Sequence, residues 1–201
     1  LYKYSLLLLF LASMHSWFTW NVKNHYLGFF VSLISVLFFF LHKNLIIFSQ
    51  KRLFACFLFI IAVMIGLKEN INAYLGPIII LFPSLIVFLI KEETILFNIL
   101  NLITNFFAIL LPFSLIGFLV SFFIDLPSFG YIEHPSGVYS TYTNYLLFIK
   151  SSFYNIRFSS IFLEPGHLGM ICSYILFANK FNFKDWRVVV ILICSLFTLS
   201  L

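Results

Sequence analysis

The chain has 201 residues, of which 62% are hydrophobic and 9% are charged, whereas soluble domains carry about 45–50% apolar and about 25% charged residues. The formal net charge is +5, but the twelve Lys and Arg residues lie scattered between apolar runs, and nucleic-acid binding proteins instead gather such residues in a basic patch. We therefore expect an integral membrane protein, with one transmembrane domain over residues 1–201.

Long apolar runs predict the membrane spans, because a helix needs about 20 residues to cross a hydrocarbon core of about 30 Å. In chain order the runs are Tyr4–Trp20, Tyr26–Leu41, Leu53–Leu67, Ile71–Ile90, Ile95–Phe123, Ile161–Phe177 and Val188–Leu201. They predict an all-α fold, a polytopic transmembrane bundle of about six or seven helices with one larger external loop. Charged residues beside the short second and third runs are expected to snorkel to the interface.

The two ends of the sequence suggest a piece of a longer protein. The first run has no small-residue cleavage site after it, so we interpret it as a retained anchor and not as a signal peptide. The chain begins with Leu1 and stops inside the apolar run Val188–Leu201, which is too short to span a bilayer comfortably. We expect a fragment that is truncated at its C-terminus.

The distribution of basic residues predicts the orientation, since cytoplasmic loops keep an excess of Lys and Arg. The N-terminus and the second, fourth and sixth loops carry eight of them, and the first, third and fifth loops carry four. We therefore expect a cytoplasmic N-terminus and an external loop over residues 124–160.

This loop is polar, and long loops between spans often carry function. It contains Asp125, Glu133 and His134 together with four tyrosines, which are Tyr131, Tyr139, Tyr142 and Tyr145. The tyrosines are either residues of the interfacial aromatic belt or platforms for sugar rings. The amphipathic stretch Tyr145–Tyr154 predicts a helix that lies in the membrane interface.

Polar and small residues inside the apolar runs need an explanation of their own. Asn98, Asn101, Asn105 and Pro112 fall on one face of the fifth run, where they either hydrogen-bond to neighbouring helices or line a hydrophilic cavity.

The cysteines lie inside apolar runs, without metal-ligand spacing or an even-numbered disulfide pattern. They are Cys56, Cys172 and Cys194. We expect them to be inert small hydrophobic residues.

The segment Arg157–Gly169, RFSSIFLEPGHLG, places an arginine, a glutamate and a histidine at the start of an apolar helix. Pro165 suits the first helical turn, so Glu164 is expected at or near the helix cap. A carboxylate there is favoured by about 0.3–1 kcal/mol, and capping alone would explain it.

Helical periodicity divides the residues of this helix between two faces. One face carries Glu164, His167, Ile171 and Tyr174, and the other carries Gly166, Gly169 and Ser173. The first face would line a site, while the second would pack closely on a neighbouring helix. The alternative is structural: an ion pair between Arg157 and Glu164, with His167 as an ordinary buried histidine.

Arg157 and the run IFLEPGHLG over residues 161–169 resemble the "R…FxEP" segment of Wzy-type O-antigen and capsule polymerases, which are relatives of the O-antigen ligases. The resemblance implies a GT-C-like inverting glycosyltransferase of the bacterial inner membrane, with its site facing the periplasm. Such an enzyme moves a glycan from undecaprenyl diphosphate onto the acceptor hydroxyl of another lipid-linked repeat unit. The resemblance implies no metal and no cofactor, and other polysaccharide-assembly membrane proteins as possible partners.

The reaction that the resemblance implies suggests roles for individual residues. A diphosphate leaving group needs positive charge, which Arg157 beside a helix start can supply, because the aspartates Asp125 and Asp185 form no Asp-x-Asp cluster for a metal. Glu164 and His167 are the candidate catalytic residues, as acid, base or acceptor-positioning groups; a base is worth about 10²–10⁴ in rate. The candidate substrate-binding residues are Arg157, Tyr174 and His134.

Two other functions remain open. In a polytopic transporter or flippase of lipid-linked oligosaccharides, the asparagine stripe would line the pathway. An O-antigen ligase would share the donor and differ in its acceptor.

Overall fold

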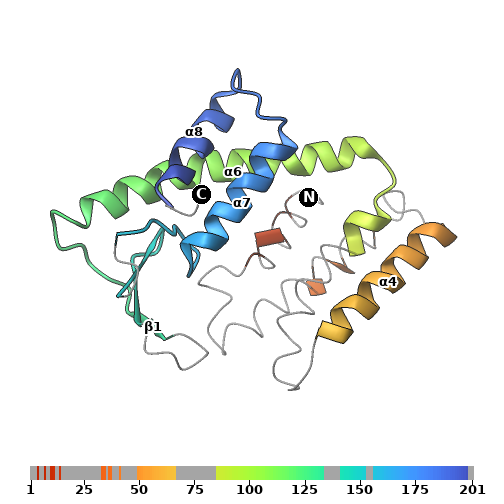
Figure 1. Cartoon of the computed structure of the whole chain (residues 1–201), viewed down its shortest axis with the longest axis horizontal. Coiled ribbons are helices and arrows are strands. Elements are labelled where there is room, and N and C mark those ends of the chain that lie inside the picture. The colour runs from red at the N-terminus through yellow and green to blue at the C-terminus, as the bar shows by residue number, and fades with distance from the viewer. Residues whose placement is uncertain are drawn as a thin grey trace. The chain divides into compact units, whose positions relative to one another are not determined.

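The computed structural model describes residues 49–66, 85–133, 141–152 and 156–198, together with positions 4, 7, 10, 11, 14, 33, 34, 36, 37 and 41 (Figure 1). The chain divides into two compact units, Leu1–Ile99 and Leu100–Leu201. Each unit is described by itself, and the expected single transmembrane domain over residues 1–201 stays a prediction.

The first unit contains α4, Gln50–Gly66, and a helical stretch over residues 85–89. Ser49 caps α4, because its Oγ accepts a hydrogen bond from Arg52 N at 3.3 Å. The Arg52 side chain donates through Nη1 to the carbonyl of Ile90, and the rings of Phe59 and Phe88 lie 6.0 Å apart. The predicted run Leu53–Leu67 is therefore helical over its described residues.

Helix α6, Glu93–Val120, begins in the first unit and continues into the second. It has 28 residues, so at about 1.5 Å per residue it is about 42 Å long. Among the described residues it is the one helix long and apolar enough to cross a membrane. The predicted run Ile95–Phe123 overlaps it closely.

A small antiparallel sheet follows α6, inside the stretch that we expect to form the external loop. Its strands are β1, Tyr131–Glu133, β2, Thr141–Asn144, and β3, Ile149–Ser151, in the order β1-β2-β3. The register pairs Ile132 with Tyr142 and Tyr142 with Ser151.

The prediction of an all-α bundle of about six or seven membrane-spanning helices is therefore wrong. The described residues include a sheet, and one helix among them qualifies as a span. The last two apolar runs form α7, Pro165–Ala178, and α8, Trp186–Leu196, with 14 and 11 residues. Their lengths are only about 21 and about 17 Å, because a tight turn ends α7 at Asn179. Most of each of the runs Tyr4–Trp20, Tyr26–Leu41 and Ile71–Ile90 lies outside the described residues.

The interfacial helix predicted over Tyr145–Tyr154 is also wrong, because part of that stretch forms strand β3. Asn144 starts the turn before it: its Oδ1 accepts from Leu146 N at 2.8 Å, while Tyr145 N donates to Phe148 O at 2.9 Å. Leu146 has a φ of 70°. Such side-chain bonds to the local backbone favour a turn over a helix.

Aromatic and aliphatic side chains together form the core of the second unit. The largest fully buried side chains there are Phe107, Leu111, Ile149, Phe158, Phe162, Leu163, Leu168 and Ile191. Phe162 stacks on Phe107 at 6.2 Å, and Phe118 meets Phe148 at 6.1 Å. Gly117 allows this approach, since a Cβ there would lie 2.9 Å from the Phe148 ring.

Candidate functional site

The segment before α7 is held by backbone hydrogen bonds to two other elements. Phe158 N donates to Phe197 O at 3.1 Å, directly after α8, and Ile149 N in β3 donates to Ser160 O at 2.9 Å. Phe158 and Ser160 are fully buried. The segment is thus a fixed junction between β3, α7 and the end of α8.

Serine hydroxyls link this junction to α6. Ser114 Oγ lies 2.8 Å from Leu147 O and 2.9 Å from Ser160 Oγ. Ser114 and Ser160 are both fully buried, and Ser160 has a φ of 51°, in the left-handed region that non-glycine residues seldom occupy. Buried hydroxyls need such partners, so these bonds fix the position from which α7 starts.

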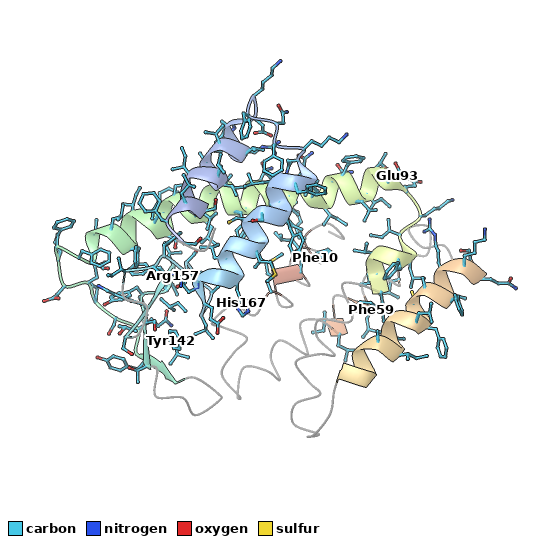
Figure 2. The ribbon with its side chains drawn as sticks, viewed as in Figure 1. Phe10, Phe59, Glu93, Tyr142, Arg157 and His167 are labelled. Carbon is cyan, nitrogen blue, oxygen red and sulfur yellow. The ribbon has the colours of Figure 1, made fainter. Side chains whose placement is uncertain are left out.

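Arg157 lies in this junction, half-buried, seven positions before Glu164. Its Nε donates to the carbonyl of Thr198 at 3.0 Å. Figure 2 shows Arg157 and His167 near the N-terminal end of α7. Thr198 could not be predicted as a partner, because the two residues are 41 positions apart in the chain.

Glu164 is the N-cap residue of α7, with φ −119° and ψ 133°, and Pro165 follows in the first turn, as predicted. Its side chain makes no capping hydrogen bond and is exposed. Capping therefore does not account for Glu164. The carboxylate stands near the positive end of the helix dipole.

His167 lies one turn into α7, and its backbone N–H donates to Glu164 O at 3.1 Å. The side chain is half-buried. Its Nδ1 atom is enclosed and has no hydrogen-bond partner within the described part of the chain. A buried polar atom without a partner costs about 1–3 kcal/mol, so this imidazole has an unused capacity to accept or donate one hydrogen bond.

The other predicted site residues are placed less favourably. Tyr174 is 68% exposed and lies two turns beyond His167, about 10 Å along the helix axis. His134 lies outside the described residues. Among the three residues of the second face of α7, only Gly169 is buried. A Cβ at Gly166 would meet nothing within 4 Å, and Ser173 is exposed. The prediction of close packing is therefore wrong at Gly166 and Ser173.

An apolar groove of about 490 Å³ borders the junction at Ile156, the residue before Arg157 in the chain. Its lining residues come from the end of α6, the junction and the end of α8: Phe118, Leu119, Phe122, Ile156, Leu196 and Phe197. Lys150 stands at this groove, with Nζ 4.3 Å from the centroid of the Phe122 ring. Sequence reasoning missed the groove, because its residues come from three separate parts of the chain.

At the other end of α7, the asparagine stripe has a partner in α8. Arg187 Nη1 donates to Asn105 Oδ1 at 2.7 Å and to Asn101 Oδ1 at 3.3 Å. Bonding between helices is therefore confirmed for these two asparagines. Arg187 Nε also donates to Asp185 at 2.9 Å, and this hydrogen bond to the guanidinium lowers the pKa of Asp185.

The cysteines are buried and unpaired with one another, as expected of small hydrophobic residues: Cys56, Cys172 and Cys194. In the ranges that the structure describes, no group of three or more His, Cys, Asp or Glu side chains gathers in a way that would hold a metal ion. The predicted absence of a metal and of a cofactor stays a prediction. No protein-family model, curated protein or solved structure matches the chain.

Proposed function

We propose that the chain belongs to a membrane glycosyltransferase that lengthens a bacterial surface polysaccharide from lipid-linked repeat units. The proposal starts from the segment RFSSIFLEPGHLG over residues 157–169. One observation carries it: the Glu164 carboxylate is exposed and makes no capping bond, and one helical turn later the Nδ1 of His167 has no hydrogen-bond partner among the described residues. Within the part of the chain that the structure describes, neither group is used to hold the fold, so both are available for chemistry.

In this proposal the donor is a glycan on undecaprenyl diphosphate, and Arg157 binds the diphosphate. A guanidinium binds phosphate oxygens through directed, charge-assisted hydrogen bonds. The apolar groove of about 490 Å³ begins at Ile156, next to Arg157 in the chain. Such a surface suits the hydrocarbon tail of a lipid carrier. The charged head and the apolar tail of one donor would then have adjacent binding surfaces.

The reaction is a displacement at the anomeric carbon of the donor sugar. The acceptor hydroxyl of a second lipid-linked unit forms the new glycosidic bond, the bond to the lipid diphosphate breaks, and the configuration inverts. The hydroxyl proton passes to Glu164 or His167, and the other residue orients the acceptor. The charge that develops on the leaving diphosphate is stabilised by Arg157.

The proposed enzyme lies in the bacterial inner membrane, with the N-terminus in the cytoplasm and the start of α7 facing the periplasm. Helix α6 is the described segment that is long and apolar enough to cross it. Other membrane proteins of polysaccharide assembly are its proposed partners.

The test is restoration of polymer length in a strain that lacks the native gene. We expect Glu164→Gln and Arg157→Ala to leave only short products, because each removes a charged group from the reacting centre. Glu93→Gln is the matched control, since Glu93 is also an exposed carboxylate at the start of a helix. Full-length polymer from Arg157→Ala at wild-type membrane levels would remove this residue from the mechanism.

The acceptor distinguishes a polymerase from a ligase. A polymerase yields longer chains that remain on undecaprenyl diphosphate, whereas a ligase moves chains of unchanged length to another acceptor. The transporter alternative has less support, because two residues of the stripe, Asn101 and Asn105, bind Arg187.

A further inference from the structure

The turn between α7 and α8 exposes an unusual set of side chains. We call residues 179–186 the α7–α8 loop; its exposed members are Lys180, Phe181, Asn182, Phe183, Lys184 and Trp186. The three aromatic residues are large hydrophobic side chains that are 46%, 58% and 60% exposed in chain order. Three exposed aromatic rings and two lysines within the seven residues 180–186 are not explained by packing against the described part of the chain.

We propose that the α7–α8 loop binds the anionic headgroup layer of a lipid bilayer. The aromatic rings would enter the boundary between headgroups and acyl chains, where Trp and other amphipathic or apolar rings anchor membrane proteins. Lys180 and Lys184 would lie against lipid phosphates, as basic residues do beside the anionic cytoplasmic leaflet. This inference does not depend on the proposed glycosyltransferase activity.

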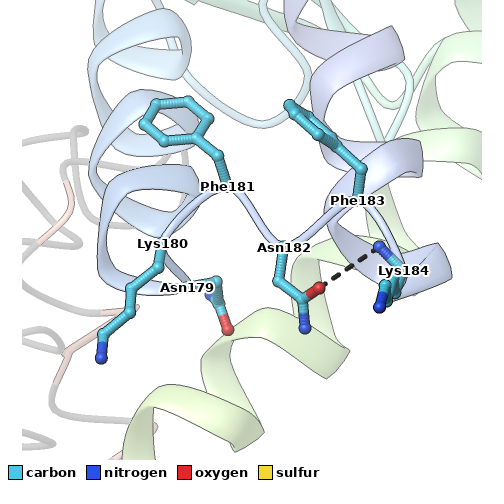
Figure 3. A pocket seen from close by; sticks show the side chains of 6 residues that line it. All are labelled: Asn179, Lys180, Phe181, Asn182, Phe183 and Lys184. Atoms are coloured by element: carbon cyan, nitrogen blue, oxygen red, sulfur yellow. Dashed lines mark hydrogen bonds between the residues drawn. The ribbon is translucent and has the colours of Figure 1, made fainter.

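The loop separates its apolar and charged side chains. Figure 3 shows Phe181 and Phe183 on one side of the backbone and Lys180 and Asn182 on the other. The two phenylalanine rings lie 6.4 Å apart. A shallow hollow of about 710 Å³ runs along residues 179–184. This arrangement fits an interface, which is apolar on one side and charged on the other.

Hydrogen bonds at the end of α7 hold the backbone of the α7–α8 loop in place without lipid. Phe181 N donates to Leu176 O at 3.0 Å and Lys180 N to Phe177 O at 2.8 Å, which is the Schellman pattern of a helix end. Lys180 occupies the left-handed position of this motif, with φ 54°, and Phe181 follows with φ 50°. Glycine is the usual residue at the first of these positions. The chain therefore presents a charge and a ring at strained positions that favour glycine.

The positive charge of the loop is not neutralised from within. Asp185 is the only acidic residue near the lysines in the sequence, and it is bound by Arg187. Arg187 in turn donates to Asn105. The charges of Lys180 and Lys184 therefore remain available to anions outside the loop.

Hydrogen bonds place the loop at a definite level along α6. Asn179 Nδ2 donates to Thr104 Oγ1 at 3.0 Å, and Arg187 Nη1 donates to Asn105 at 2.7 Å. From Thr104 to Val120 the helix rises about 24 Å, which approaches the thickness of a hydrocarbon core of about 30 Å. When α6 crosses a bilayer with Val120 near one interface, the loop lies near the other.

The test measures contact between Trp186 and lipid in the full chain. Trp17→Phe and Trp20→Phe leave Trp186 as the only tryptophan, and the protein is placed in nanodiscs with brominated phosphatidylcholine or brominated phosphatidylglycerol. We expect both lipids to quench Trp186, with about fivefold or greater preference for phosphatidylglycerol. Lys180→Gln with Lys184→Gln should reduce the preference to about one, and Lys91→Gln, the control on an exposed lysine outside the loop, should leave it unchanged.

A second variant separates the charge of Lys180 from its structural role. Lys180→Gly relieves the left-handed backbone, so we expect unchanged or higher thermal stability together with a lower preference for phosphatidylglycerol. Absence of quenching by both lipids, or equal quenching by both in the wild-type loop, would overturn the proposal. Protection of Trp186 from both lipids and from aqueous iodide would also overturn it, and would point to a protein partner.

Discussion

Helices α7 and α8 both start directly after an acidic residue, but they use it differently. Asp185 caps α8, with Oδ1 accepting from Arg187 N at 3.0 Å, whereas the Glu164 side chain makes no capping bond to α7. The start of α7 is held by apolar burial instead, through Pro165 and Leu168. Two acidic residues at equivalent positions of two helices therefore have different structural roles: one caps its helix and the other does not. Only where the fold does not need the carboxylate is it available to a substrate.

The largest expected effect comes from removing the burial that holds the start of α7. Leu168 is fully buried, so Leu168→Ala should lower the free energy of unfolding by about 2–5 kcal/mol. Thermal unfolding of the purified full chain in detergent measures this loss. Met170→Ala on the exposed side of the same helix is the matched control, with an expected change within about 0.5 kcal/mol. Equal losses from the two variants would contradict burial as the anchor.

A smaller effect is expected at the start of α8. Asp185→Ala removes the capping acceptor and should cost about 1 kcal/mol of unfolding free energy at neutral pH. The hydrogen bond from Arg187 lowers the pKa of Asp185, so the stabilisation is complete above the ordinary pKa of about 3.9 and is lost as the pH falls through the lowered value in the folded protein. Unfolding of the wild type and Asp185→Ala should therefore converge in strong acid. A difference that stays constant with pH would show that Asp185 acts without its charge.

The smallest effect on stability is expected at Glu164. Since its side chain is exposed and makes no capping bond, Glu164→Ala should change the free energy of unfolding by less than about 0.5 kcal/mol. The same variant should lose the proposed activity. A destabilisation as large as that of Asp185→Ala would mean that the two helix starts are alike, and would remove the argument for chemistry at Glu164.

Helix α6 and the start of α7 could be predicted from the sequence, because both depend on residues that are close together in the chain. The helix over Glu93–Val120 follows from a long apolar run, and the start of α7 follows from Pro165, whose missing N–H is no loss in a first turn. The sheet could not be predicted in the same way. Its strands have three or four residues, too few for alternation to be visible, and local turn chemistry at Asn144 decides the conformation.

Contacts between distant residues determine the surroundings of both ends of α7. Arg187 and Asn105 are 82 positions apart, and Arg157 and Thr198 are 41 apart. Helical periodicity predicts which residues share one face of a helix, but it does not predict which other part of the chain that face contacts. For the same reason the expected close packing at Gly166 failed, while Gly117, which the sequence did not single out, is where a ring approaches a helix backbone.

The link between Ser114 and the residues after the sheet has a consequence for biosynthesis. Ser114 contacts Leu147 and Ser160, which are 33 and 46 positions later in the chain. When α6 leaves the ribosome, the hydroxyl of Ser114 and the backbone at Gly117 lack their partners. These partners lie in the β2–β3 hairpin and the junction, which are translated later. Docking of that region is thus a late event in maturation, and this surface of newly made α6 stays uncovered until then.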